Sequence, residues 1–247
     1  MQKWVEGTVV NQKRWTQTLF TLQVQADVAP FEAGQFAKLA LSVEGAMVAR
    51  PYSFVNAPTE RPHEFYYVTL PDGPLTQRLC RMGAGDAIYL APRPAGFLVL
   101  SEIPDGENLW LISTGTGVGP FLSILKTEVP WRRFRQVVLV HAVRHAEELT
   151  YRDSVSRLLG EHAEQMRMVS FVSRESQPGA LHGRIPLAIE EGRLEAAAGV
   201  ALSANTSRVM ICGNPEMVTD TSAALARRGM KKHRRREPGH IALENYW

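Results

Sequence analysis

Hydrophobic and polar residues alternate along most of the first hundred positions of this chain. The segments WVEGTVVNQKRW and TLFTLQVQA follow a period of two residues, which is typical of half-buried β-strands. Four further short segments follow, separated by turn residues such as Pro71-Asp72-Gly73: GQFAKLALSV, RPYSFVNA, HEFYYVTL and DAIYLAP. Six short strands at this spacing predict a closed antiparallel six-stranded barrel, interrupted by one short helix near residues 74–82.

The pattern changes after about residue 100, where apolar runs alternate with segments of helical period. The apolar runs NLWLISTG, QVVLVHAV, MRMVSFVSRE and SRVMICGN are typical of buried parallel strands. The helical segments are PFLSILKTEV, EELTYRDSVSRLLGEHA, IPLAIEEGRL and PEMVTDTSAALARRG. This order predicts a two-domain β plus α/β protein whose second domain is a doubly wound parallel sheet. A segment rich in proline and glycine places the boundary near residue 100, which gives domains over 1–100 and 101–247.

Length, charge and cysteine content narrow the function classes. The 247 residues, 45% of them hydrophobic, suffice for one large domain or two of ordinary size. A net charge of +3 suits an acidic partner without requiring nucleic acid. Cys80 and Cys212 are too few for a disulfide scaffold or a four-cysteine iron–sulfur cluster. With no signal-peptide pattern and no apolar run of membrane-spanning length, we expect a soluble cytoplasmic protein.

The first strand of the second half ends in a glycine-rich loop, Gly115-Thr116-Gly117-Val118-Gly119-Pro120. Glycines let a backbone pass close to a pyrophosphate, and the following helix begins where an anion is favoured. The spacing differs from the G-x-G-x-x-G fingerprint, and a glycine-rich turn without a ligand is the alternative. The position between a buried strand and a helix favours dinucleotide binding.

Arginines follow the next two strands. The second strand ends at Val143-Arg144, where NAD-selective folds often carry an acidic residue. The third strand ends at Ser173-Arg174, and Arg184 follows shortly afterwards. Guanidinium groups form charge-assisted bonds with phosphate oxygens, so these residues favour the extra phosphate of NADP. Solvated surface arginines are the alternative interpretation.

The fourth strand ends at Cys212-Gly213-Asn214. Gly213 would let a nicotinamide ring lie against the backbone. Cys212 has no histidine beside it in the sequence, so a nucleophilic role is unsupported, and a small buried side chain is the alternative.

The segment Arg50-Pro51-Tyr52-Ser53 combines a cation, an aromatic ring and a hydroxyl in one extended stretch. Alternate side chains of a strand share a face, so Arg50 and Tyr52 could contact one ligand together. Ser53 would point elsewhere unless the strand bends there.

An ordered set of motifs links these segments. The set is RPYS at 50–53, PDGPLTQRL at 71–79, GTGVGP at 115–120, VSRE at 172–175, CGNPEM at 212–217 and a terminal ENYW. With these motifs the chain resembles the bacterial ferredoxin/flavodoxin–NADP reductases, in the subgroup that ends in Tyr-Trp. The resemblance covers essentially the whole chain.

The resemblance implies a barrel that holds one non-covalent FAD and a second domain that binds NADP(H). It places Arg50 at the flavin phosphates, Tyr52 on the isoalloxazine and Ser53 near the flavin N5. Tyr52, Ser53 and Cys212 are the implied catalytic residues. The implied FAD contacts also include Pro51, Tyr67, Val68, Thr69, Pro74, Leu75, Thr76, Thr116, Tyr246 and Trp247, the last stacked on the adenine. The implied NADP contacts are Thr116, Val143, Arg144, Ser173, Arg174, Arg184, Gly213 and Asn214.

Two positions call for separate expectations. Gly117 stands where some relatives carry alanine, and we expect it only to loosen the loop. Glu244 lies in a variable part of the tail, and its role in proton transfer stays open.

The resemblance implies a monomeric enzyme that passes electrons from NADPH through FAD to a ferredoxin or a flavodoxin. An acidic partner could dock on basic residues; the candidates are Arg132, Arg133, Arg135, Lys231, Lys232, His233, Arg234, Arg235 and Arg236. Alternatives are a free-flavin or quinone reductase, an oxygenase reductase component, and a non-catalytic flavin- or nucleotide-binding regulatory module. A nucleic-acid binder is disfavoured because aromatic residues do not interleave with the basic run. No metal site and no membrane contact are expected.

Overall fold

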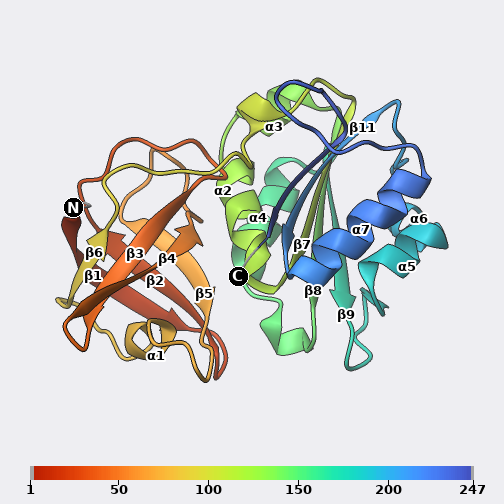
Figure 1. The fold of residues 1–247 in the computed structure, drawn as a ribbon. Coiled ribbons are helices and arrows are strands. Elements are labelled where there is room, and N and C mark those ends of the chain that lie inside the picture. Colours follow the sequence, from red (N-terminus) through yellow and green to blue (C-terminus); the bar gives the residue numbers. More distant parts are fainter. Residues whose placement is uncertain (1–2, 246–247) are drawn as a thin grey trace.

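The computed structural model describes residues 3–245 and places two six-stranded sheets side by side (Figure 1). The strands of the first sheet are β1 (Val5–Arg14), β2 (Leu19–Gln25), β3 (Phe36–Val43), β4 (Ala46–Ser53), β5 (His63–Val68) and β6 (Ala87–Leu90). The strands of the second are β7 (Asn108–Thr114), β8 (Gln136–Val143), β9 (Met166–Val172), β10 (Ala180–His182), β11 (Ser207–Gly213) and β12 (Ile241–Asn245). The predicted architecture of a β half followed by an α/β half is confirmed.

The first sheet is antiparallel and follows the order β4-β3-β6-β1-β2-β5. A bridge between Phe54 and Phe65, with the amide of Val55 donating to the carbonyl of Glu64 at 2.9 Å, joins its two ends. Its inward positions, such as Leu22 and Leu39, are fully buried. The alternation of apolar and polar residues therefore closes the sheet around its own core. The short helix α1 (Thr76–Leu79) is present within the predicted segment.

The second sheet is parallel throughout and follows the order β10-β9-β8-β7-β11-β12. The chain starts at the central strand β7, moves outward through β8 and β9, and then returns to the other side of β7. The order therefore reverses between β7 and β11. Ligands of open α/β sheets bind at the carboxyl ends of the strands at such a reversal.

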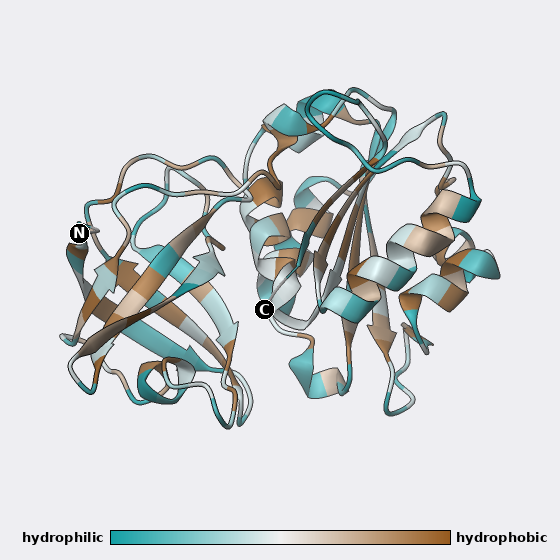
Figure 2. Ribbon diagram, in the orientation of Figure 1, coloured by the Kyte–Doolittle hydropathy of each residue, from teal (hydrophilic) through white to brown (hydrophobic). Residues whose placement is uncertain are grey.

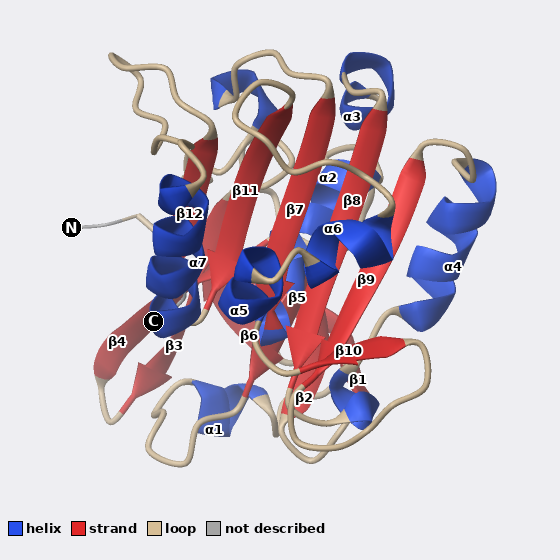
Figure 3. Cartoon of the chain, turned by 90° about the vertical axis from the view of Figure 1, so that its right-hand side faces the viewer, coloured by secondary structure: helices blue, strands red, loops and turns tan. Residues whose placement is uncertain are grey.

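Helices cover both faces of this sheet, as expected of a doubly wound fold (Figure 3). One face carries α2 (Gly119–Leu125), α3 (Val129–Arg133) and α4 (Arg152–Glu161); the other carries α5 (Ile185–Glu190), α6 (Arg193–Ala198) and α7 (Pro215–Arg227). The side chains of successive β7 residues point alternately to the two faces of the sheet. Leu109 and Leu111 belong to the core beneath α2 to α4, whereas Trp110 and Ile112 belong to the core beneath α5 to α7. The central strands are therefore predominantly apolar (Figure 2).

Helix boundaries differ from the periodic segments at two backbone positions. The expected helix at EELTYRDSVSRLLGEHA begins only at Arg152, because Tyr151 has a left-handed backbone with φ +57°. The expected helix at IPLAIEEGRL is divided into α5 and α6 by Gly192, at φ +72°. The edge strands β10 and β12 were not predicted, since they are only three and five residues long and show no clear period.

One of the buried hydrophobic clusters spans the barrel and the α/β half. Leu19, Val55 and Tyr66 of the barrel belong to the same buried cluster as Leu122 and Tyr151 of the α/β half. Within residues 3–245, no helix is long and apolar enough to cross a membrane.

Candidate functional site

The reversal point of the parallel sheet brings two glycine-containing loops into contact. The turn Gly115–Val118 follows β7, and Gly213 ends β11. A Cβ atom at Gly117 would lie 2.4 Å from the carbonyl oxygen of Cys212 and 2.9 Å from Cα of Gly213. The expectation that Gly117 only loosens the loop is therefore wrong. The absence of a side chain lets the two loops touch.

Replacing Gly117 with alanine should lower the free energy of unfolding by about 1–3 kcal/mol, because an added atom must displace backbone rather than a flexible side chain. Urea denaturation at neutral pH measures this change. Gly160 of α4 is the matched control, since a Cβ there meets nothing within 4 Å. The Gly160→Ala variant should be more stable than the parent, because alanine favours a helix. A Gly117→Ala variant as stable as the parent would contradict the steric argument.

Gly213 and Asn214 complete the junction of the two loops. Gly213 has φ +146°, and a Cβ atom there would lie 2.2 Å from Oγ1 of Thr114. The amide of Asn214 donates to the same Thr114 oxygen at 3.1 Å. The Asn214 side chain accepts hydrogen bonds from the amides of Glu216 and Met217, so it caps α7. Asn214 therefore has a structural role at the position where a nucleotide contact is predicted.

His141 of β8 contacts the backbone of the glycine turn. Its side chain is 2% exposed, and its Nε2 lies 3.1 Å from the carbonyl oxygen of Gly115. Burial lowers the pKa of His141 to about 4, so the ring is neutral at pH 7 and Nε2–H donates to that carbonyl. A histidine inside an apolar strand gave no sequence signal for this role.

The predicted arginines gather at the same edge of the sheet. The amide of Arg174 donates to the carbonyl of Arg144 at 2.9 Å, and the amide and hydroxyl of Ser173 both donate to the carbonyl of Val143. Within residues 3–245, the side chains of Arg144 and Arg174 are exposed and have neither an ion pair nor a hydrogen bond. Arg184 instead pairs with Glu216 at 3.3 Å. Two guanidinium groups are therefore available to an anion, and the third has an acidic neighbour that the sequence did not indicate.

The segment from Arg50 to Ser53 forms the end of β4, an edge strand of the barrel sheet. Arg50 is exposed, Tyr52 is half-buried, and Ser53 is 4% exposed. Tyr52 meets the ring of Tyr67 edge-on, with 6.1 Å between centroids. Burial raises the pKa of Tyr52 well above its usual value, so its phenol stays neutral.

Two buried hydroxyls in this part of the barrel have unsatisfied hydrogen-bonding capacity. Oγ of Ser53 and Oη of Tyr67 have no hydrogen-bond partner among the described residues. Such atoms are costly unless a ligand or a water molecule meets them. They mark the edge of β4 and β5 as a place that fits a polar ring system.

Strand β5 lies next to the glycine turn. It is the last strand in the order of the barrel sheet, and its last residue is Val68. It contacts the turn Gly115–Val118, which includes the buried Thr116. The amide of Thr69 donates to the carbonyl of Thr18 at 2.8 Å. The structure therefore brings the predicted flavin strand and the predicted nucleotide loop together.

The three residues around the start of α1 are held by local contacts. Leu75 is buried, and its carbonyl accepts from the amide of Leu79 at 2.9 Å. The Thr76 hydroxyl accepts from the amide of Leu70 and donates to the carbonyl of Gly73. Pro74 precedes them and is exposed. The Thr76 side chain is therefore occupied within the loop.

Cys212 lies in the middle of the sheet edge that carries the site. It is fully buried, and it pairs in register with Ser113 of β7 on one side and Glu244 of β12 on the other. Its side chain belongs to the core beneath α2 to α4.

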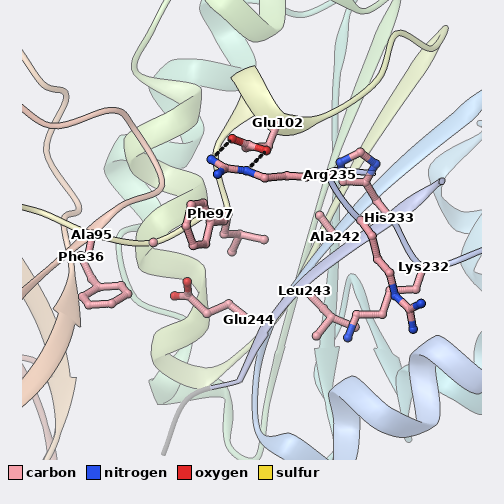
Figure 4. Close-up of a pocket in the computed structure, with 13 residues that line it drawn as sticks. Phe36, Ala95, Phe97, Glu102, Lys232, His233, Arg235, Ala242, Leu243 and Glu244 are labelled. Carbon is pink, nitrogen blue, oxygen red and sulfur yellow. Dashed lines mark hydrogen bonds and ion pairs between the residues drawn. The ribbon is translucent and has the colours of Figure 1, made fainter. Parts of the chain in front are cut away.

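A groove of about 480 Å³ separates the barrel from β12 (Figure 4). Phe36 and Phe97 line one side, and Glu244 lies in its wall. Burial raises the pKa of Glu244 to about 7, so this carboxyl group takes up a proton near neutral pH. The sequence left Glu244 without a role. Tyr246 and Trp247 lie outside the described residues.

Several of the predicted docking residues are already engaged. Arg235 pairs with Glu102 and lies 4.4 Å from the ring centroid of Phe97. Arg133 donates to the carbonyls of Leu100 and Ile103. Arg132, Arg135 and Arg234 pair with Glu128, Glu107 and Glu237, respectively. In the part of the chain that the structure describes, Lys231, Lys232 and Arg236 are exposed and have no ion pair.

Comparison with known proteins places this architecture in a family. Residues 111–223 match the family described as "Oxidoreductase NAD-binding domain". The flavodoxin/ferredoxin–NADP reductases of Shigella flexneri and Escherichia coli are 48% and 47% identical to the chain, each over 100% of both chains. A solved ferredoxin NADP+ reductase from Neisseria gonorrhoeae, with bound FAD and NADP, is 35% identical, with a TM-score of 0.94 over 100% of both chains. The chain therefore belongs to the flavodoxin/ferredoxin–NADP reductase family.

Proposed function

We propose that this protein is an NADPH-dependent FAD flavoprotein that exchanges electrons with a small ferredoxin or flavodoxin. The observation that carries the proposal is the contact between β5 and the turn Gly115–Val118, with Gly213 beside that turn. A flavin held by the barrel and a nicotinamide held by the loops would therefore meet at one junction. The full-length relatives named above support the same activity.

The barrel residues fit a flavin. The unsatisfied hydroxyls of Ser53 and Tyr67 offer hydrogen bonds to a polar ring, and Tyr52 offers a neutral aromatic face. Arg50 offers an exposed guanidinium for phosphate oxygens. Further contacts are proposed for Pro51, Val68, Thr69, Pro74, Leu75, Thr76, Thr116, Tyr246 and Trp247. In this proposal, residues 1–100 hold FAD and residues 101–247 hold NADP.

The loop residues fit a dinucleotide that carries an extra phosphate. Arg144 and Arg174 lie on hydrogen-bonded neighbouring loops, and their side chains have no protein partner within residues 3–245. Arg184 and Ser173 would complete the phosphate site, while Gly213 gives a ring access to the backbone. Val143 and Asn214 lie at the ends of the same strands. An arginine cluster in this place favours NADPH over NADH.

FAD, when bound, would supply the chemistry that accepts two electrons as a hydride and releases them singly. The protein's own residues hold and orient the reactants, and no dedicated acid or base is required for that exchange. The Ser53 hydroxyl would orient the ring through a hydrogen bond. The buried turn at Thr116, together with Val55 and Phe121, would exclude water from the junction.

Purification followed by absorbance spectroscopy tests this function directly. The purified protein should show flavin absorbance, which NADPH should bleach under anaerobic conditions much faster than NADH does. A colourless protein that takes up no FAD would refute the proposal. Comparing turnover with ferredoxin, flavodoxin and free flavin identifies the acceptor and tests the alternative of a free-flavin reductase.

Salt should slow turnover with an acidic redox partner. Lys231, Lys232 and Arg236 are exposed cations, of which Lys232 lines the groove. Screening by salt weakens their attraction for the partner. Raising the ionic strength from about 50 to about 300 mM should therefore lower the rate with ferredoxin several-fold. A Lys232→Gln variant should depend less on salt, whereas Arg157→Gln on α4 should behave like the parent. A rate that is independent of salt would contradict docking on this surface.

We further propose that the protein acts as a monomer in the cytoplasm. Size-exclusion chromatography with light scattering tests the first statement, and fractionation of cells tests the second.

A further inference from the structure

A directed chain of hydrogen bonds crosses from the barrel to the parallel sheet at Tyr151. The Nε1–H of Trp15 donates to Oγ1 of Thr21 at 2.7 Å, and that hydroxyl lies 2.6 Å from Oη of Tyr151. Oη of Tyr151 donates to a carboxylate oxygen of Glu64 at 2.7 Å. Since the carboxylate only accepts and the indole only donates, Thr21 must donate to Tyr151. The hydroxyls of Thr21 and Tyr151 therefore each donate in one fixed direction along this series of hydrogen bonds.

A second contact lies next to this chain. The hydroxyl of Thr150 donates to Oη of Tyr66 at 2.9 Å. The Tyr151 ring also packs against two rings of the barrel half, with 4.9 Å to Trp15 and 5.3 Å to Tyr66. Tyr151 is 6% exposed, and burial beside Glu64 raises its pKa far above neutrality, so its hydroxyl stays a donor. We call Thr150 and Tyr151 with these barrel partners the Tyr151 latch.

The backbone of the latch is held in a costly conformation. Tyr151 has φ +57° and ψ +23°, which L-residues adopt at a cost and bulky residues rarely adopt. Glu44, the other described non-glycine residue with a positive φ, lies in a hairpin turn where such angles are common. Backbone strain at a bulky residue persists only where its surroundings determine it strongly. Here the surroundings are the partners of the Tyr151 side chain.

The latch is attached to both halves of the proposed site. On the barrel side, Tyr66 directly precedes Tyr67 and Val68 of β5, the strand that contacts the glycine turn. On the sheet side, the connection that ends at Tyr151 begins at Arg144. The Glu148 carboxylate accepts hydrogen bonds from the amides of Arg144 and His145, so this short connection is tied to itself. A movement at Tyr151 would therefore be transmitted to Arg144 and to β5.

We propose that Tyr151 is a positioning residue that sets the alignment of the parallel sheet relative to β5, and with it the alignment of the nicotinamide and the flavin. This inference rests on the proposed function. Tyr151 itself touches neither reactant. Rates of hydride transfer depend steeply on alignment, and a displacement of about 1 Å can cost about a hundred-fold.

The test uses the Tyr151→Phe variant of the FAD-loaded protein, which keeps the ring but removes the bridging hydroxyl. Stopped-flow measurement should show a rate of flavin reduction by NADPH about ten-fold or more below that of the parent. The dissociation constant for 2′-phospho-AMP, measured by calorimetry, should change less than two-fold, because the loops of Arg144 and Arg174 are hydrogen-bonded to each other and would shift together relative to β5. Long-wavelength charge-transfer absorbance between flavin and nicotinamide should weaken. Tyr89→Phe on β6 is the control, because the Tyr89 hydroxyl makes no hydrogen bond within residues 3–245.

The outcomes separate this inference from the proposed function. A parent protein that NADPH does not reduce refutes the function, whereas a reducible parent with an equally fast Tyr151→Phe variant refutes only the positioning role. Loss of stability without a change in rate or in charge-transfer absorbance also refutes it, because the latch would then be purely structural. If Tyr151→Phe does not fold, Thr150→Val removes the contact with Tyr66 alone and should slow reduction in the same way. An unaltered rate in that variant would then overturn the proposal.

Discussion

Replacing Arg174 with alanine is expected to raise the KM for NADPH about thirty-fold and to leave the KM for NADH nearly unchanged. A hydrogen bond to a charged group contributes about 2 kcal/mol, which corresponds to that factor. Arg174 is exposed and has no side-chain partner within residues 3–245, so its loss leaves no buried group unsatisfied in the free protein. Steady-state kinetics with both dinucleotides measures the effect.

The matched control for this prediction is Arg157→Ala. Arg157 is an exposed residue of α4 whose side chain has no ion pair in the described part of the chain. It carries the same charge as Arg174, so its removal reveals any effect of net charge alone. The preference for NADPH should survive in this control. Equal changes in KM for both dinucleotides in Arg174→Ala would contradict the assignment of Arg174 to the extra phosphate.

The free energy of unfolding is expected to fall by about 3 kcal/mol for each of two buried histidines as the pH drops from 6.5 to 4. Burial lowers the pKa of His63 and His141 from 6.5 to about 4, with Arg61 contributing at His63. The folded state therefore favours neutral rings, and the stability present above pH 6.5 is lost as the unfolded chain takes up protons. Urea midpoints across this range measure the loss.

Single variants assign the pH effect to its residues. His63 is enclosed by the rings of Phe31 and Phe54, so His63→Phe keeps an apolar cage and should flatten the dependence by its share. His141→Gln should flatten it similarly and should also disturb the Gly115 carbonyl that His141 supports. The exposed His182 offers the control, and His182→Gln should keep the full dependence. A parent protein equally stable at pH 7 and pH 4.5 would contradict the neutral buried rings.

The periodic segments of the sequence predicted most of this fold. The alternation in the first half and the apolar runs of the second encode burial directly, so the strands of both sheets follow from them. The edge strands β10 and β12 were not predicted because they are too short, at three and five residues, to show a period. The helix breaks at Tyr151 and Gly192 were not predicted, because a left-handed backbone conformation does not change the spacing of hydrophobic residues.

The site was predictable where chemistry lies at strand ends, as at Arg144, Arg174 and Gly213. It was not predictable where one side chain depends on another that is distant in the sequence. The Glu216 neighbour of Arg184, the support of Gly115 by His141 and the Tyr151 latch are of this kind. The error at Gly117 has the same origin, because its tolerance depends on a carbonyl of Cys212 that only the folded sheet brings near.

The buried cluster that spans the barrel and the α/β half determines how the protein unfolds on heating. Leu19, Val55 and Tyr66 are covered by residues of the α/β half, so a barrel cut off near residue 100 would expose that apolar surface to water. An α/β half expressed without the barrel would likewise expose apolar surface to water. The two halves have separate sheets, but each depends on the other for its stability. Calorimetry should record one cooperative transition, and neither half should serve as an exchangeable module in a chimaera.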